Sequence, residues 1–237
     1  MKKAAIIVAG GTGIRMNTGI PKQFIPLSGK PMLMQVLNAF AAYNAEMPLF
    51  IALPLPFIQH WKSLCKDYSY HIPHQVITGG QTRFHSVRNA LNYIPDDCLV
   101  AIHDGVRPLI SRNLISHSFA EAALHGNAIP VLAVNESLRM IIDATSKPAD
   151  RSMFRIVQTP QVFQATLIKK AYDQEYQTKF TDDATVFESF GEKLHLVDGE
   201  PGNIKITYPV DLLFAEAIFL PFQEYEKRFP DIPMKTI

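Results

Sequence analysis

The sequence predicts an α/β protein in which a mostly parallel sheet lies between two layers of helices. Short apolar runs rich in β-branched residues alternate with longer segments of helical periodicity, and several of those runs are apolar throughout. Strands that are apolar throughout are covered by helices on both faces. Strand–helix alternation gives parallel pairing through right-handed crossovers. We therefore expect a Rossmann-like three-layer α/β/α fold.

The elements follow one another in a regular order along the chain. The expected strands are 4–9, 49–53, 74–78, 98–103, 128–134 and 193–197. The expected helices are 31–43, 56–67, 83–93, 112–125, 165–177, 182–189 and 209–220. In the fourth helix, Leu114, Ile115 and Phe119 recur at helical spacing. Pro209 suits the first turn of the last helix.

Residues 135–157 interrupt this alternation. Within them, "LRMIID" and "FRIV" predict two short strands joined by the polar "ATSKPADRS", which together indicate a projecting β-hairpin. A hairpin without a core of its own needs a surface to pack on. That surface is provided by a second subunit or by the arm's own domain. We expect a single domain, 1–237, with the arm 135–157 inserted for contact between the subunits of a homodimer.

Composition limits the classes of function. The chain has 237 residues, of which 47% are hydrophobic and 19% charged, and its formal net charge is +1. These values are typical of an ordinary globular protein with a sizeable core, and the small net charge argues against nucleic-acid or membrane partners. Cys65 and Cys98 match no cysteine or histidine ligand pattern and indicate neither a zinc site nor a disulfide framework, so a cytoplasmic location is expected.

The stretch "AGGTGIRMNTGIPKQF", residues 9–24, follows the first expected strand. Gly10, Gly11 and Gly13 leave the backbone N–H groups open to an anion, and Arg15 and Lys22 add positive charge. The stretch lacks the G-K-[ST] of a P-loop and the third glycine and acidic residue of a dinucleotide site. It therefore predicts a nucleoside triphosphate site, with a tight structural turn as the alternative.

A second group of residues follows the strand at 98–103, in "HDGVRP". Asp104 lies at a strand's carboxyl end, where ligands bind in such sheets. A carboxylate beside phosphates requires a divalent cation between them, and the Arg107 fork suits another anionic group. The alternative is a turn-forming Asp104 and a surface ion pair.

Three further segments are weaker signals. "GGQTRFHSV" at 79–87 follows another strand, and it offers backbone groups to a base and the Ser86 hydroxyl to a ribose. Thr82 in this segment also suits a helix cap. Lys205 in "NIKIT" alternates with apolar neighbours, which alone indicates a solvent-facing lysine. Asp182 and Asp183 in "TDDATVFE" suit a helix start. The eight histidines are scattered and indicate no acid–base site.

Taken together, these segments resemble the sugar-phosphate cytidylyltransferases. The resemblance covers nearly the whole chain, through "IIVAGGTGIRM", "PKQF", "GGQTRFHSV", "HDGVRP", "DRSMFRIVQTPQVF", "TDDATVFE" and "NIKIT" in the family's order. It implies transfer of CMP from CTP to a polyol phosphate, with release of pyrophosphate and with Mg²⁺ as cofactor. It also implies that the arm clasps a partner subunit.

The resemblance also implies a role for each matching residue. Those implied to act in catalysis are Arg15, Lys22, Arg151 and Lys205. Those implied to bind CTP and its metal are Ala9, Gly10, Gly11, Gly13, Gly80, Gln81, Ser86 and Asp104, with Asp104 as the metal ligand. Those implied to hold the phosphate of the second substrate are Arg107, Ser137, Arg151 and Lys205, and Ser137 and Arg151 serve their own or a partner's site.

Three departures bear on the choice of substrate. "HDGVRP" replaces the family's usual "HDAARP", Ser137 replaces a threonine, and Gly10 replaces an alanine. The long arm favours 2-C-methyl-D-erythritol 4-phosphate, an isoprenoid precursor of the non-mevalonate route, whereas Val106 also suits ribitol 5-phosphate. A nucleotide-binding regulator without catalytic activity is the alternative from another class. A dinucleotide oxidoreductase is disfavoured because no acidic ribose ligand is present.

Overall fold

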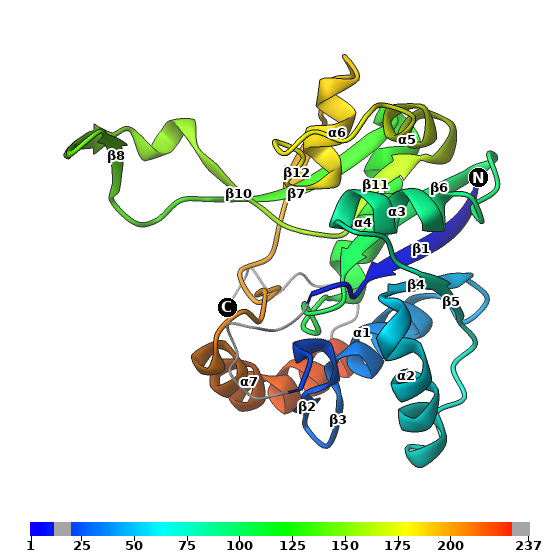
Figure 1. The fold of residues 1–237 in the computed structure, drawn as a ribbon. Helices are drawn as coiled ribbons and strands as arrows, with labels where there is room; N and C mark the ends of the chain where they lie inside the picture. Colours follow the sequence, from blue (N-terminus) through cyan, green and yellow to red (C-terminus); the bar gives the residue numbers. More distant parts are fainter. Residues whose placement is uncertain (12–19, 229–237) are drawn as a thin grey trace.

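The computed structural model describes residues 1–11 and 20–228 and confirms the α/β fold, with a central sheet flanked by helices (Figure 1). Strands pair in the order β10-β7-β11-β6-β1-β4-β5, and β12 also pairs with β7. The strands of this sheet are β1 (Lys2–Val8), β4 (Leu49–Leu53), β5 (Gln75–Thr78), β6 (Cys98–Asp104), β7 (Asn127–Ala133), β10 (Arg155–Val157), β11 (Gln161–Gln164) and β12 (Leu196–Asp198).

Most of the sheet is parallel, as expected. β1 pairs in parallel with β4 and β6, β4 with β5, and β7 with β12. The antiparallel strands are β11, between β6 and β7, and β10 beside β7. β11 was not expected from the sequence, because "QVFQ" is short and places glutamine at both ends. Gln161 is nevertheless fully buried, since its amide groups bond to Asp182 and to the Ala184 backbone.

Helices cover both faces of the sheet, and alternate residues of β1 point into the two layers. Ala4 and Ile6 face the core under α3, α5 and α6, whereas Ala5 and Ile7 face the core under α1, α2 and α4. The helices are α1 (Met32–Tyr43), α2 (Leu55–Asp67), α3 (Arg83–Leu91), α4 (Arg112–His125), α5 (Ala165–Tyr172), α6 (Asp183–Ser189) and α7 (Pro209–Arg228). A small hairpin, β2 (Pro26–Leu27) with β3 (Lys30–Pro31), precedes α1.

Helix boundaries agree with the expected ones where a cap is present. α4 begins after Ser111, whose hydroxyl accepts from the Leu114 N–H, and ends at Gly126 with φ 85°. α7 instead continues through Pro221, eight residues beyond the expected end at 220. Phe219 and Phe222 on either side of that proline are buried in a third core cluster, and their burial keeps the segment helical.

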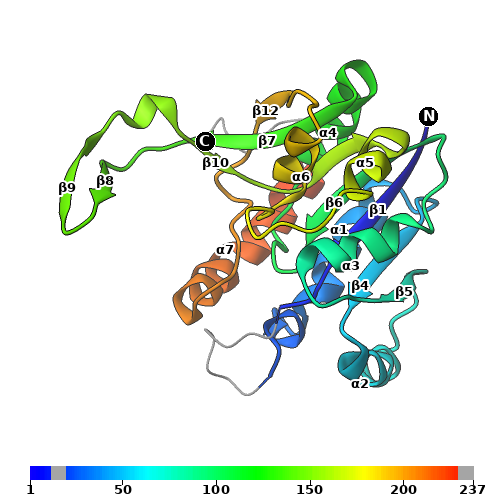
Figure 2. The ribbon, with the colours of Figure 1, turned by 45° about the horizontal axis from the view of Figure 1, so that its top comes forward.

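The arm projects away from the sheet (Figures 1 and 2), but its strands pair differently from the prediction. β8 (Leu138–Ile142) pairs with β9 (Thr145–Ala149), a segment expected to be a polar loop. Asp143, with φ 49°, makes the tight turn between them. The "FRIV" segment instead forms β10 on the main sheet, after the short helix η3 (Arg151–Met153). The single-domain assignment of 1–237 stays a prediction.

A helix that crosses a membrane must be both long and apolar. Within residues 1–11 and 20–228, no helix combines the length and the apolar character needed to cross a membrane.

Candidate active site

A cavity of about 330 Å³ opens at the carboxyl ends of β1, β5 and β6. This edge of the sheet is where the strand order predicts a ligand. Segments from distant parts of the sequence form its walls: the turn after β1, the short helix η2 (Lys22–Phe24), the loop before α3 and the segment before α7. The predicted site residues that line it are Ala9, Gly10, Gly11, Lys22, Gly80, Gln81, Ser86, Asp104 and Lys205.

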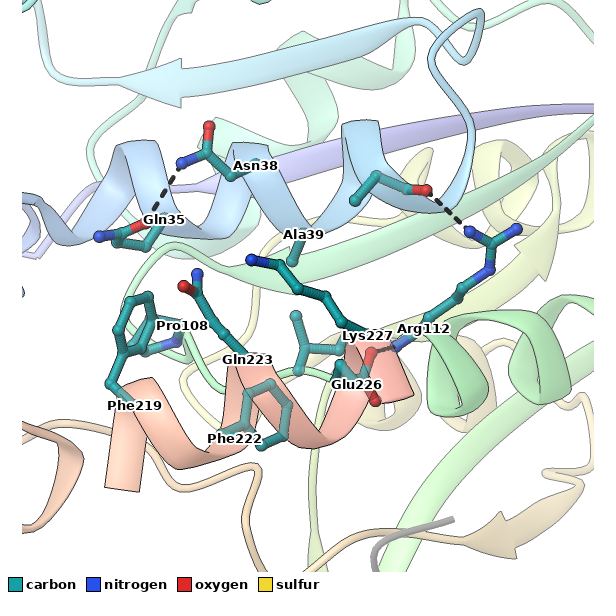
Figure 3. A pocket seen from close by; sticks show the side chains of 12 residues that line it. Gln35, Asn38, Ala39, Pro108, Arg112, Phe219, Phe222, Gln223, Glu226 and Lys227 are labelled. Carbon is teal, nitrogen blue, oxygen red and sulfur yellow. Dashed lines mark hydrogen bonds between the residues drawn. The ribbon is translucent and has the colours of Figure 1, made fainter. Parts of the chain in front are cut away.

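A larger cavity, of about 500 Å³, lies between α1, the start of α4 and α7 (Figure 3). Its walls include Phe219, Phe222 and Pro108, and at one end the Arg112 backbone N–H donates to Glu226 at 2.9 Å. None of the predicted site residues that the structure describes lines it. The smaller cavity is the better candidate, because cations and open backbone groups converge there.

The turn after β1 is held from two sides. The Ala9 N–H donates to the Ala52 carbonyl at 3.0 Å, and the buried Gln23 side chain donates to the Ala9 carbonyl at 2.9 Å. Lys22, next to Gln23, extends along this turn, since a Cβ placed on Gly11 would lie 3.4 Å from Lys22 Cε. The ammonium group donates to the Ile206 carbonyl at 3.4 Å. Lys22 is therefore held over the glycine turn, as a phosphate site requires.

The predicted residues Gly13 and Arg15 lie outside the described residues. Their assignment to the triphosphate stays a prediction.

The loop before α3 requires glycine at position 80. A Cβ built there would lie 2.3 Å from His85 Cβ, so any other residue would displace the backbone. Ser86 Oγ accepts from the Gly80 N–H at 3.0 Å and donates to the Thr82 carbonyl at 2.9 Å. Thr82 also caps α3. Ser86 thus shapes the loop that faces the cavity; its contact with a ribose stays a prediction.

Asp104 is the electrostatic centre of the site. Lys205 Nζ lies 2.9 Å from Oδ2, Arg107 Nε lies 3.4 Å from the same oxygen, and Arg83 Nε lies 3.8 Å from Oδ1. The Asp104 side chain is 11% exposed. Lys205 is exposed to solvent, as its alternation with apolar neighbours indicates, and its side chain is 45% exposed. Its ammonium group nevertheless pairs with a buried carboxylate.

The three cations determine the charge of Asp104. Burial raises the pKa of this carboxyl, but Arg83, Lys205 and Arg107 outweigh burial, and its pKa lies well below the ordinary value. Asp104 is accordingly ionised at neutral pH. Asp104 and Asp183, which pairs with Arg83, supply two carboxylates against these three cations, and Lys22 adds a fourth cation to the cavity. The cavity therefore favours an anionic ligand.

Arg83 and Asp183 form a buried ion pair that sequence reasoning missed. The guanidinium donates to both carboxylate oxygens, at 2.7 and 2.6 Å, and the Tyr172 hydroxyl donates to Oδ1 at 2.6 Å. Burial lowers the pKa of Arg83, but Asp183 outweighs it and raises that pKa above its ordinary value. Asp182 and Asp183 were both expected at a helix start, and both lie there: Asp182 is the N-cap and accepts from the Thr185 N–H, and Asp183 is the first residue of α6. The ion pair of Asp183 with Arg83 is the additional role.

Three predicted substrate residues do not line the cavity of this chain. Arg107 lies behind Asp104 and donates to the Asn203 carbonyl at 2.9 Å. Ser137 and Arg151 are exposed on the arm, and Arg151 donates to the Asn135 carbonyl. The role of the two arm residues in their own or a partner's site stays a prediction.

The His103 side chain has a structural role inside the fold. It is fully buried, with Nδ1 3.0 Å from Thr159 Oγ1 and Nε2 3.1 Å from the Arg107 carbonyl. Burial lowers the pKa of His103 to about 4, so the imidazole is neutral at physiological pH. It behaves as the polar strand end expected from the sequence.

The cavity thus combines a glycine turn, fixed cations and one ionised carboxylate on a Rossmann-like sheet. These features define the class as a nucleotidyltransferase, which joins two anionic groups without a protein nucleophile. A family model described as 2-C-methyl-D-erythritol 4-phosphate cytidylyltransferase matches residues 3–220. The chain belongs to this family.

Individual relatives support the assignment. Proteins of that name from Phocaeicola vulgatus and Bacteroides thetaiotaomicron are each 45% identical over 218 residues, which is 92% of this chain and 100% of each relative. The crystal structure of the Francisella tularensis protein of that name is 30% identical, with a TM-score of 0.76, over 92% of this chain and 99% of that one.

We predict that Asp183→Asn destabilises the fold by about 3 kcal/mol, because it leaves Arg83 without its buried counter-ion. Asp182→Asn is the matched control on the same helix start; it retains an N-cap oxygen and costs about 1 kcal/mol for one altered hydrogen bond. Urea unfolding of both variants measures the difference. Equal losses in the two variants would contradict the assigned ion pair.

Proposed function

We propose that this chain transfers the cytidylyl group of CTP to 2-C-methyl-D-erythritol 4-phosphate and releases pyrophosphate. The single observation that carries the proposal is the cationic cavity at the sheet's carboxyl edge, in a chain of this family. The relatives are named for this reaction, and this chain aligns with them over their whole length. The free cysteines, Cys65 and Cys98, suit the reducing cytoplasm expected from the sequence.

The reaction is one in-line displacement. An oxygen of the methylerythritol phosphate forms a bond to the α-phosphorus of CTP, and the bond from that phosphorus to the bridging oxygen breaks, so its electron pair leaves with pyrophosphate. The attacking oxygen is already anionic and needs no base. The protein must hold two polyanions together and stabilise the charge that accumulates during transfer.

Lys22 suits the α-phosphate, because it is held over the glycine turn by its neighbour Gln23 and by the Ile206 carbonyl. Arg15 is assigned to the same phosphate by the family resemblance. Lys205 also lines the cavity and suits the phosphate of the second substrate, together with Arg151. Fixed cations stabilise a transition state well, because little reorganisation remains.

Asp104 fits a magnesium ion shared with the phosphates. A buried carboxylate that remains ionised is a hard oxygen donor, and Mg²⁺ commonly takes one or two protein carboxylates with substrate phosphates as the other ligands. The Lys205 ammonium at 2.9 Å marks a cation-binding position on Oδ2. Bound there, Mg²⁺ would neutralise charge on the triphosphate; Asp104 would hold the ion in place of the Lys205 ammonium, which would be released toward the substrate phosphates.

Base recognition is assigned to the loop before α3. Gly80 and Gln81 line the cavity, and Ser86 fixes the course of the loop through the Gly80 N–H. A backbone fixed in this way can present its N–H and carbonyl groups to the edge of cytosine.

We also propose that the arm holds a second subunit. Met140, Ile141, Met153 and Ile156 are 45%, 72%, 81% and 51% exposed, and the two-stranded hairpin β8–β9 has no core of its own. A large apolar surface on a projecting arm is typical of an interface between subunits. Such an interface would also bring Ser137 and Arg151 toward a neighbouring cavity.

We expect pyrophosphate release from CTP and Mg²⁺ with 2-C-methyl-D-erythritol 4-phosphate, and much slower release with ribitol 5-phosphate. Ribitol 5-phosphate is the appropriate comparison because Val106, which also suits that substrate, lines the cavity.

Lys22→Ala and Arg15→Ala should each lower kcat by on the order of 10²–10³, since each removes one fixed charge from the transition state.

Lys30→Ala is the matched control for these variants, because Lys30 is exposed on β3 and lies outside the cavity. Near-normal turnover after loss of Lys22 would refute its catalytic role. CTP binding without pyrophosphate release from either polyol phosphate would instead identify a nucleotide-binding regulator.

For the arm, we predict that Ile141→Asp shifts a dimer toward monomer in light scattering, because a charge cannot be buried without a partner at the interface. Leu55→Asp is the control, since Leu55 is similarly exposed, at 67%, but lies on α2. A wild-type chain that is monomeric at assay concentration would exclude the arm-mediated dimer.

A further inference from the structure

Three possible metal ligands converge on the edge of the sheet opposite the active site. Glu121 and His125 lie one turn apart near the end of α4, and His195 immediately precedes β12. Glu121 Oε2 lies 2.9 Å from His195 Nε2 and 3.6 Å from His125 Nε2. Within residues 1–11 and 20–228, this is the one group of three or more His, Cys, Asp or Glu side chains whose ligand atoms all lie within 4.8 Å.

The backbone holds the three side chains in place. Gly126 ends α4 directly after His125, and β7 begins at the next residue. That residue, Asn127, is buried; its Oδ1 accepts from the His195 N–H at 2.8 Å, and its Nδ2 donates to the Lys193 carbonyl at 2.9 Å. The Ile129 N–H donates to the His195 carbonyl at 2.9 Å. The approach of the two histidines is therefore built into the pairing of β7 with β12.

The three donor groups already converge, because both Nε2 atoms approach the same carboxylate oxygen, His195 at hydrogen-bond distance. The two imidazole rings stack with centroids 3.7 Å apart and planes 16° apart. Since a metal ion lies in the plane of each imidazole that it binds, the His125 ring, which is 47% exposed, must turn for both rings to bind one ion. Tetrahedral zinc with bonds of about 2.0–2.1 Å places its ligand atoms about 3.3 Å apart. The observed separations of 2.9 and 3.6 Å from Glu121 Oε2 lie on either side of that value.

The surroundings also favour a cation. The side chains of Glu121, His125 and His195 are 24%, 47% and 33% exposed, which leaves a path for an ion and room for a water ligand. The cluster lies at the carboxyl end of α4, where the helix dipole favours positive charge.

We propose that Glu121, His125 and His195 bind one zinc-class divalent cation, with water completing the coordination. Two nitrogen donors and one carboxylate suit Zn²⁺, Co²⁺ or Ni²⁺, whereas Mg²⁺ prefers oxygen ligands. The ion connects α4 to β12, and the chain continues from β12 to Lys205 at the active site. The site is separate from the ion assigned to Asp104.

The test is a titration of the full-length, chelator-treated protein with Zn²⁺ in excess Mg²⁺, followed by calorimetry. We expect one ion per chain and a rise in the unfolding temperature, because binding to the folded state stabilises it. His125→Ala and His195→Ala should each weaken binding more than about tenfold. Co²⁺ should give the visible absorption of a low-coordinate site in the wild type and lose it in both variants.

His117→Ala is the matched control, because His117 is exposed on the same helix and lies outside the cluster. It should bind like the wild type. Circular dichroism confirms that each variant is folded before titration. Absence of saturable Zn²⁺ binding, or equal affinity in the wild type and both cluster variants, would overturn the proposal. Neither result depends on turnover, so the proposed cytidylyl transfer stands or falls separately.

Discussion

The arrangement of the active site depends on one buried carboxylate that is surrounded by more positive charge than it can neutralise. Asp104 stays ionised because Arg83, Arg107 and Lys205 outweigh the cost of its burial. In return, it holds Lys205 at the cavity wall. In the proposed function, the excess positive charge attracts a polyanion, and the carboxylate would hold a magnesium ion beside that polyanion. Binding and catalysis in this account both follow from that imbalance.

The sheet brings these charged groups together, because it joins segments that are distant in sequence. Asp104 ends β6, Arg83 begins α3 after β5, and Lys205 lies in the segment between β12 and α7. Arg83 is fixed by Asp183, a residue 100 positions further along the chain. Because Asp104 and Arg83 are held in place before a ligand binds, little reorganisation of these two groups is needed during transfer.

Much of this could be predicted from sequence, for identifiable reasons. β4 and α4 have the expected bounds, since an uninterrupted apolar run and a capped helical stripe are local signals. The sequence did not predict two features that depend on tertiary contacts. These are the continuation of α7 through Pro221 and the pairing of β10 with β7. The candidate site shows the same division. Its glycine turn and Asp104 follow from local motifs, whereas the contacts of Arg83 and Lys205 with Asp104 exist only in the fold.

The most direct test is a crystal structure of the protein with CTP and Mg²⁺. The account predicts the triphosphate over Gly10 and Gly11 with its α-phosphate beside Lys22, the metal on Asp104, and the Lys205 ammonium displaced toward the open side of the cavity. A triphosphate bound elsewhere, for instance in the larger cavity between α1 and α7, with Lys205 still paired to Asp104, would contradict it.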